Sequence, residues 1–517
     1  MHPANEASDA GRTLARFADA GLSERQIEHG DAKNLRDSAL FAASSAVVFG
    51  GFQFLFAGGY LPNALLGNPN EPADATRVGL YLGLLWVLLQ VIHALPARWM
   101  KPAILVATLA TLPMLVPLWV IGVLLVYGYV LYFVVHADIP GPIRWSTLLI
   151  IWAGLYLGYM DVLDPLVRSR DMHGFAVLLF AAYFLKDVYY LFEKTTVYKS
   201  RTDRAPLRDF YIFFLASPFF FNPFHIKPIG YTYFHEKFLD RPKGKIALGG
   251  VGLFALGVFY LLLHAHVFSL WYEWGRAPRA LTPDLIEAAK AQAALSGLSP
   301  TRLIWAEFAS MPGWELLFFV YYNVVKVFLA LAGNVYLIVG IIRMFGFDIK
   351  ADFHFPFLAR NLLEHWRRWN IYNRDFVVAL IFNPIVFTLR RKLNRYLVFF
   401  IACMLTFIGG LGILVHLITT TFYVGEARFF IGIMSRTVVL GFATTINIWI
   451  ELAMSQNGRG RRLDEWYAAR PYLNYPRHAI KILFTFTLVA TIYFMQQGLT
   501  AGLSLEDVGR MLWSIVA

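Results

Sequence analysis

Long apolar runs dominate the chain, and short polar connections separate them. A membrane-spanning helix needs about 20 mainly apolar residues, so runs of this length predict about 11 to 13 transmembrane or re-entrant helices. They lie near 38–60, 77–97, 102–136, 143–163, 173–193, 245–271, 312–345, 374–389, 396–424, 429–453 and 478–497. The runs 102–136 and 312–345 are long enough for either one helix or two. The pattern predicts an all-α polytopic membrane protein.

Two stretches in the rest of the chain depart from this pattern. Residues 206–235 are aromatic but contain Pro218, Pro223 and Pro228, and proline removes a backbone donor from any lipid-facing helix. We expect either a re-entrant, cavity-lining segment or an interfacial aromatic belt there. Residues Leu503 to Val516 are amphipathic, which fits a helix on the surface or one packed back onto the protein.

Residues 1–37 carry scattered charges of both signs and lack the basic start and apolar core of a secretory signal. We expect a polar cytoplasmic tail over 1–37 and a multi-helix membrane domain over 38–517.

Composition strengthens the membrane assignment. The chain has 517 residues, 58% of them hydrophobic and 15% charged, whereas soluble proteins carry about 25% charged residues. The net charge is +12. The basic residues crowd short loops, and basic short loops of membrane proteins usually face the cytoplasm. The charge therefore indicates how the chain is oriented in the membrane rather than a surface that binds nucleic acid. These loops hold Arg390, Arg391, Lys392 and Arg395; Arg459, Arg461 and Arg462; and Lys194, Lys199, Arg201 and Arg204. The single cysteine, Cys403, allows no intrachain disulfide and no cysteine-based metal site.

Charged and aromatic residues concentrate in the stretch 343–375. Arginine grips phosphate in a planar fork and stacks on indole rings, so this mixture suits the binding of an anionic or flat group. A cytoplasmic interface helix with tryptophan anchors would have a similar composition. Composition therefore leaves both interpretations open.

The order of residues within this stretch resembles the membrane-bound O-acyltransferase family. That family has an Arg-x-Phe-Gly-Phe helix end followed by a stretch of the form Asn-Phe-x-x-Pro-Tyr-Leu-Ala, then Glu-Phe-Trp-Arg-Arg-Trp-His. The matching positions are Arg343, Phe345, Gly346, Phe347, Phe353, Pro356, Phe357, Leu358, Ala359, Glu364, Trp366, Arg367, Arg368 and Trp369. The resemblance covers about 175–455 and is strongest over 333–375.

The resemblance implies a multi-pass fold of that family in the bacterial cytoplasmic (inner) membrane. It implies transfer of an acyl group, acetyl or longer, from a thioester to a hydroxyl. The donor would be an acyl-CoA or an acyl carrier protein, as co-substrate rather than bound cofactor, and no metal is implied. The acceptor would be an envelope polysaccharide, a lipid or a secreted product. Membrane lipid and an envelope protein are the further partners expected, with no nucleic acid.

Two polar residues mark the centre of that family, and Asn370 and His416 fall at their positions. His416 follows Asn370 by 46 residues and sits within an apolar run, between Leu414-Val415 and Leu417. Ionisable groups inside a membrane are costly and usually face a cavity or a partner. A neutral imidazole can take a proton from an attacking hydroxyl, although bonding to Thr419, Thr420 or a backbone carbonyl would also satisfy this side chain.

The resemblance assigns roles to the remaining site residues. Those expected to bind the anionic donor are Arg360, Trp366, Arg367, Arg368, Trp369 and Arg374. Glu364 and Asp375 are expected to pair with nearby arginines, and Pro356 to shape the backbone. A catalytically inactive scaffold of the same shape and a membrane transporter are the alternatives, although few charges fall in the middle of the apolar runs.

Overall fold

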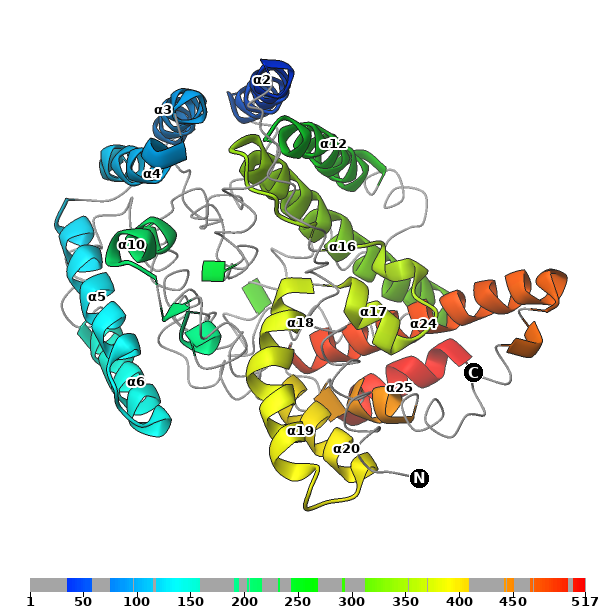
Figure 1. Ribbon diagram of the computed structural model, residues 1–517. Helices are drawn as coiled ribbons and strands as arrows, with labels where there is room; N and C mark the ends of the chain where they lie inside the picture. Colours follow the sequence, from blue (N-terminus) through cyan, green and yellow to red (C-terminus); the bar gives the residue numbers. More distant parts are fainter. Residues whose placement is uncertain are drawn as a thin grey trace.

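A computed structural model describes much of the chain, and every regular element in the described ranges is a helix (Figure 1). The described residues are 35–57, 75–95, 97–114, 118–158, 190–194, 202–203, 205–215, 231–232, 243–267, 291–292, 312–351, 353–369, 371–408, 441–442, 444–450, 465–467, 469–500 and 505–516. The expected all-α class is therefore confirmed for these ranges.

Helix α16 (Gly313–Met344) crosses the centre of the molecule. It packs against α12 (Lys243–Leu262), α2 (Leu35–Ala57), α24 (Pro471–Thr500) and α25 (Leu505–Val516). The run 312–345 thus forms one helix rather than two. It contains no proline after Pro312, and its 32 residues span about 48 Å at 1.5 Å per residue.

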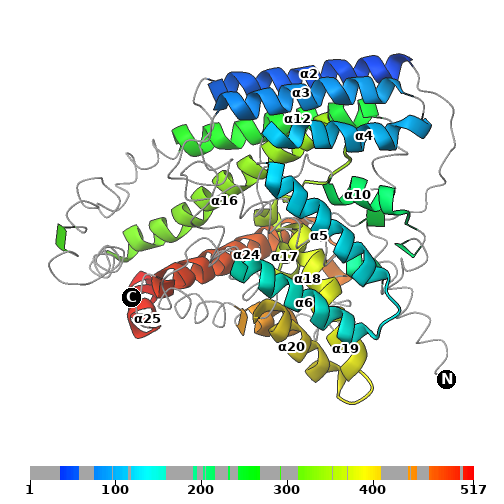
Figure 2. The ribbon, with the colours of Figure 1, turned by 90° about the vertical axis from the view of Figure 1, so that its left-hand side faces the viewer.

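A second group of helices lies along one side of α16. Helix α3 (Ala75–Ala94) packs against α2 and against α4 (Ala97–Thr111), and Figure 1 shows α3 and α4 on the opposite side of α2 from α12; Figure 2 shows the same helices from the side. A short 3₁₀ turn, η2 (Leu112–Met114), ends α4, and α5 (Leu118–His136) begins just after Pro117. Pro113 and Pro117 therefore fall between two helices, since proline disfavours a continuous helix, whereas Pro102 lies in the second turn of α4. Helix α6 (Gly141–Gly158) packs on α5.

The aromatic stretch 206–235 begins with a buried helix. Helix α10 (Leu207–Leu215) packs between α4 and α5, and Phe210, Phe213 and Phe214 lie in its core. This part is enclosed by protein rather than arranged as an aromatic belt at the surface. Residues 216–230 lie outside the described residues.

The C-terminal half adds a chain of short helices and two helices that support α16. In order these are η7 (Pro356–Leu358), α17 (Leu362–Arg368), α18 (Ile371–Val377), the π-helical turn η8 (Val378–Phe382), α19 (Asn383–Leu389) and α20 (Arg395–Leu405). Val508 and Met511 of α25 are buried, and α25 contacts α16 and α24. The amphipathic C-terminal stretch therefore packs back onto the protein.

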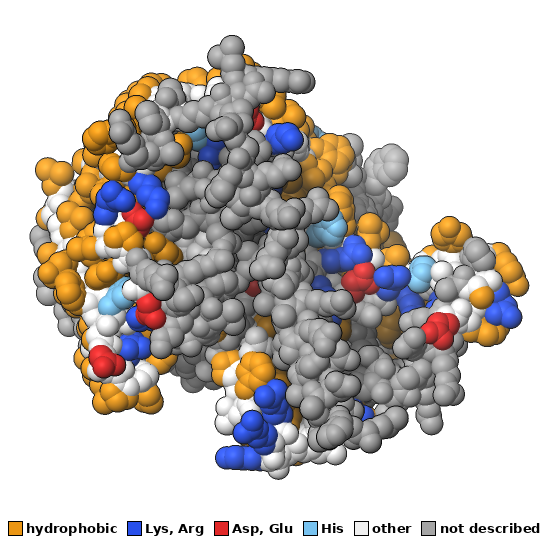
Figure 3. All heavy atoms as spheres, viewed as in Figure 1, with side chains coloured by type: hydrophobic (Ala, Val, Ile, Leu, Met, Phe, Trp, Pro, Cys, Tyr) orange, Lys and Arg blue, Asp and Glu red, His pale blue; other side chains and the backbone are white. Residues whose placement is uncertain are grey.

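Three of the described helices are long and apolar enough to cross a membrane, judged by length and composition. They are Lys243–His266, Gly313–Met344 and Tyr472–Met495; five more apolar helices are shorter. Large apolar side chains also face outward along α5 and α6, including Leu118, Val126 and Ile150 (Figure 3). A broad exposed apolar surface is typical of contact with lipid, and together these features indicate a membrane protein.

Glycines bring α12 and α16 into backbone contact. A Cβ atom added at Gly257 would lie 2.6 Å from the backbone nitrogen of Leu337 and 2.8 Å from the carbonyl oxygen of Gly333. At Gly340, an added Cβ would lie 2.9 Å from the backbone nitrogen of Phe254 and 3.0 Å from the carbonyl oxygen of Gly250. Small residues of this kind allow close helix packing in membranes.

Candidate functional site

The candidate site begins where α16 ends. Arg343 turns back on the following loop: its Nε donates to the Ile349 carbonyl oxygen at 2.7 Å, and its guanidinium lies 3.0 Å from an Asp348 carboxylate oxygen. Gly346 has φ +84°, in the left-handed region that glycine tolerates best, and its carbonyl oxygen accepts from Lys243 Nζ at 3.2 Å. Arg343 and Gly346 therefore shape the turn.

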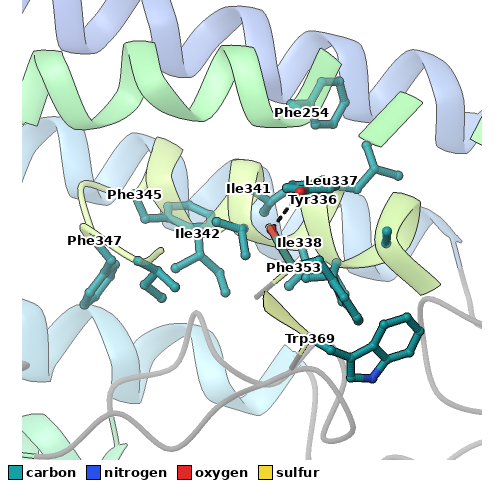
Figure 4. Packing of buried hydrophobic residues seen from close by; sticks show 14 of the residues in the cluster. Phe254, Tyr336, Leu337, Ile338, Ile341, Ile342, Phe345, Phe347, Phe353 and Trp369 are labelled. Carbon is teal, nitrogen blue, oxygen red and sulfur yellow. Dashed lines mark hydrogen bonds between the residues drawn. The ribbon is translucent and has the colours of Figure 1, made fainter. Parts of the chain in front are cut away.

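Aromatic side chains fix the next segment to α16. Phe345, Phe347 and Phe353 are all buried, and the Tyr336 hydroxyl donates to the Phe353 carbonyl oxygen at 2.7 Å (Figure 4). Trp369 packs on Phe353 with ring centroids 5.0 Å apart. These contacts hold both ends of the stretch 353–369 against one helix.

A tight turn then leads into α17. Phe355 adopts φ 48°, which is unusual for a residue other than glycine, and Pro356 starts the turn η7. Asn361 caps α17, because its side-chain oxygen accepts from the Glu364 backbone nitrogen at 2.7 Å. Pro356 thus lies at the first position of this turn.

Glu364 joins two of the arginines. Its carboxylate accepts from Arg368 at 2.6 Å, from the Arg360 side chain at 3.3 Å and from the Arg360 backbone nitrogen at 2.9 Å. Partial burial would raise the pKa of Glu364, but these donors outweigh it and lower that pKa. Glu364 therefore stays ionised and holds Arg360 and Arg368 in place.

The other two arginines are Arg367, near the end of α17, and Arg374, in α18. Arg374 Nε donates to an Asp375 carboxylate oxygen at 2.8 Å, and its Nη1 donates to the Arg367 carbonyl oxygen at 2.8 Å. Arg367 itself is exposed. Residues 360–375 hold four arginines and two carboxylates, so this segment by itself carries a net positive charge. Figure 3 shows basic and acidic side chains together over α17.

His365 lies beneath the arginines, in the interior. Its Nδ1 is 3.1 Å from the Pro356 carbonyl oxygen, and its ring stacks on Trp369 with centroids 5.5 Å apart. Burial lowers the pKa of His365 to about 4, and the contact with the Pro356 carbonyl only partly offsets this. The imidazole is therefore neutral at pH 7, with Nδ1 donating to the carbonyl.

Because of the buried His365, we expect the folded protein to lose stability in mild acid. Because this histidine binds its proton more weakly in the folded protein, stability is complete above about pH 6.5 and falls as pH drops toward 4, by up to about 3 kcal/mol. His365→Asn keeps a donor for Pro356 but cannot titrate, so its melting temperature in detergent should depend less on pH between 4 and 7.

The exposed His354 supplies the matched control for this measurement. His354→Asn removes one histidine from the same stretch and should preserve the pH dependence of the wild-type protein. Equal pH profiles for wild-type protein and His365→Asn would contradict the assigned role of His365.

The two tryptophans predicted to bind a donor occupy different environments. Trp369 is 6% exposed, and its rings are enclosed by His365, Phe353 and Tyr493. It packs in the interior and supports the stretch from there, and its predicted contact with a donor stays a prediction. Trp366 is partly buried against Phe407, and its buried indole N–H has no acceptor among the described residues. Of the two tryptophans, Trp366 is therefore the one whose indole N–H lacks a hydrogen-bond acceptor among the described residues.

Both predicted catalytic residues, Asn370 and His416, lie outside the described residues. The structure brings Arg360, Glu364 and Arg368 together, and separately links Arg367, Arg374 and Asp375 through short contacts. Within the described ranges, no group of three or more histidine, cysteine, aspartate or glutamate side chains could hold a metal ion.

A second polar cluster, which the sequence did not reveal, lies between α4, α5 and α10. Asp209 is buried, 2.8 Å from Lys101 Nζ and 3.1 Å from Arg208 Nε. Burial would raise the pKa of Asp209, but these two cations lower it. Nearby, His136 Nε2 lies 3.1 Å from the Thr202 carbonyl oxygen and 3.3 Å from the Tyr190 hydroxyl. The contacts within the cluster join helices far apart in sequence, which indicates a structural role.

Comparison with known proteins adds no assignment. No protein-family model matches the chain, and no curated protein matches it.

Proposed function

We propose that this chain is a membrane-bound O-acyltransferase that moves an acyl group from a thioester donor to a hydroxyl. The acceptor would be an envelope polysaccharide, a lipid or a secreted product. The observation that carries the proposal is the order and spacing of residues from Arg343 to Trp369, which resemble those of that family. The full multi-pass fold and the inner-membrane location belong to the same proposal.

The contacts within the stretch are consistent with this role. Arg343, Gly346 and Phe353 fix its backbone to the end of α16, and Glu364 orients two arginines on its surface. Guanidinium groups held in this way suit a phosphate-bearing carrier arm, because each can form a forked pair with phosphate. The net positive charge would also attract an anionic donor.

In the proposed reaction, His416 removes the proton from the acceptor hydroxyl as its oxygen attacks the thioester carbonyl carbon. The Asn370 side-chain amide N–H steadies the oxyanion that forms. The carbon–sulfur bond then breaks, and the thiolate takes the proton from the His416 imidazolium to leave as a free thiol. The products are the acylated acceptor and the free carrier thiol, with no change in oxidation state.

Transfer of a labelled acyl group tests this proposal. The purified full-length protein in lipid nanodiscs would be incubated with acetyl-CoA or longer acyl-CoA labelled in the acyl group, and with candidate acceptors. We expect labelled product to accumulate with one free thiol released for each acyl group transferred. Folded protein that transfers no label from any donor would favour the inactive scaffold instead, and solute flux in sealed vesicles without transfer would favour a transporter.

A further inference from the structure

The turn between α19 and α20 concentrates positive charge at one end of the molecule. Arg390, Arg391, Lys392 and Arg395 are all exposed there, and Figure 3 shows basic side chains at the tip of this hairpin. Among the described residues, none of these four cations pairs with a carboxylate. Structural arginines elsewhere in the protein do pair with acids, as Arg343 does with Asp348, so the charge at this turn is available for an external anion.

Aromatic rings position two of these cations. The Arg390 guanidinium lies over the Phe387 ring at 4.9 Å, and that of Arg395 lies over the Tyr396 ring at 4.9 Å. Arg395 also donates to the Tyr396 hydroxyl at 3.0 Å. Stacking of this kind restricts an arginine side chain while leaving its outer N–H groups able to donate.

An apolar groove begins directly beside the turn. It has a volume of about 550 Å³ and is lined by Asn394, Tyr396, Leu397, Phe400, Ile446 and Trp449. One wall is braced, because the Trp449 indole N–H donates to the Tyr396 carbonyl oxygen at 3.0 Å. The groove runs along α20, part of a short apolar helix that extends from Arg395 to Ile408.

We propose that this turn and groove bind an anionic phospholipid. The phosphate would meet Arg395 and the neighbouring cations, and an acyl chain would lie in the groove below, against Leu397 and Phe400. Two features select a lipid: a soluble anion would use the charge and leave the groove empty, whereas a neutral lipid would use the groove alone. Basic clusters at the ends of membrane helices typically recognise anionic headgroups. This site is separate from the proposed acyl-transfer site.

Binding of two phospholipids to the purified full-length protein tests the proposal. Native mass spectrometry would compare phosphatidylglycerol with phosphatidylcholine of the same chain length. We expect the dissociation constant for phosphatidylglycerol to be at least about tenfold lower, because its headgroup carries a net negative charge, whereas the choline cation of phosphatidylcholine offsets the phosphate charge and is repelled by the basic side chains. The combined variant Arg390→Gln, Lys392→Gln, Arg395→Gln should lose this preference. These three side chains are exposed, so the variant should fold.

A second variant tests the groove without changing charge. Leu397 is 46% exposed, so Leu397→Trp should fill the groove without disturbing the core and weaken phosphatidylglycerol binding several-fold. Leu393→Trp is the matched control, since Leu393 lies on the turn, is 37% exposed and does not line the groove. Arg470→Gln with Arg477→Gln controls for loss of charge elsewhere, and both control variants should bind phosphatidylglycerol as wild type does.

Four results would overturn the proposal. Equal affinity for the two phospholipids would remove the role of the cations. Equal weakening by Arg470→Gln with Arg477→Gln would indicate general charge attraction, and equal weakening by Leu393→Trp would show that the groove is not the site of the acyl chain. Glycerol phosphate that binds as tightly as phosphatidylglycerol would show a site for free anions in which the groove has no part.

Discussion

Replacement of His416 by alanine is expected to reduce acyl transfer by about 10²- to 10⁴-fold, the usual contribution of a general base. In the proposed reaction His416 is the only ionisable side chain among residues 407–418, so no other group close to it in sequence can accept the hydroxyl proton. Alanine removes a polar group from an apolar segment, so the variant should remain folded. The measurement is the initial rate of label transfer from acyl-CoA by equal amounts of purified protein.

His266 supplies a control from another apolar segment. It is exposed in the π-helical turn η5 (Leu263–Val267) that follows α12, and His266→Ala should transfer acyl groups at the wild-type rate. Both variants should elute as the same monodisperse species as the wild type. A folded His416→Ala protein with full activity would place the base elsewhere, and a large loss in His266→Ala would show that the assay responds to histidine removal in general.

The apolar pattern located the helices, but it left the runs 102–136 and 312–345 open as one helix or two. In the first run, Pro113 lies in η2 and Pro117 directly precedes α5, where proline interrupts the helical hydrogen-bond pattern. The run 312–345 has no proline after Pro312, and its length alone did not decide between one helix and two. What makes it one helix is its position between α12 and α24, where apolar side chains are buried along its whole length.

The sequence pointed to the stretch that holds the candidate site, but it could not predict which of its side chains would be buried and which would lie near the surface. Trp366 and Trp369 lie three residues apart, yet Trp369 enters the core and Trp366 does not. The difference comes from Phe328 on α16 and Tyr493 on α24, which enclose Trp369. Neither residue is near the stretch in sequence. His365 is similar, because only the fold shows that its ring stacks on Trp369 beside the Pro356 carbonyl.

The contact between α12 and α16 was also hidden from the sequence. Glycine is common in membrane helices, and its presence says little about which face will meet another helix. Other glycines, such as Gly409, Gly410 and Gly412, also lie in an apolar run of the sequence, and they fall outside the described residues. The observed contact instead uses Gly250 and Gly257 on α12.

Replacement of Gly257 by leucine is expected to destabilise the protein strongly. Its first side-chain carbon would lie 2.6 Å from the Leu337 backbone nitrogen and 2.8 Å from the Gly333 carbonyl oxygen. These are backbone atoms within a helix, so they cannot move aside as a flexible side chain can. Overpacking usually costs about 1–3 kcal/mol, and a clash with backbone should reach about 3 kcal/mol or more. Thermal unfolding of the purified protein in detergent, followed by loss of the monodisperse peak, measures the effect.

Gly252→Leu is the matched control, since it makes the same substitution in the same helix. An added Cβ at Gly252 meets nothing within 4 Å, and replacing glycine should favour the helix slightly. This variant should therefore unfold at or above the wild-type temperature, while Gly257→Leu unfolds well below it. Equal melting temperatures for the two variants would contradict the close contact. Because Arg343 lies in the last turn of α16 and the Gly346 carbonyl accepts from Lys243 of α12, separating these helices should also displace the start of the candidate site.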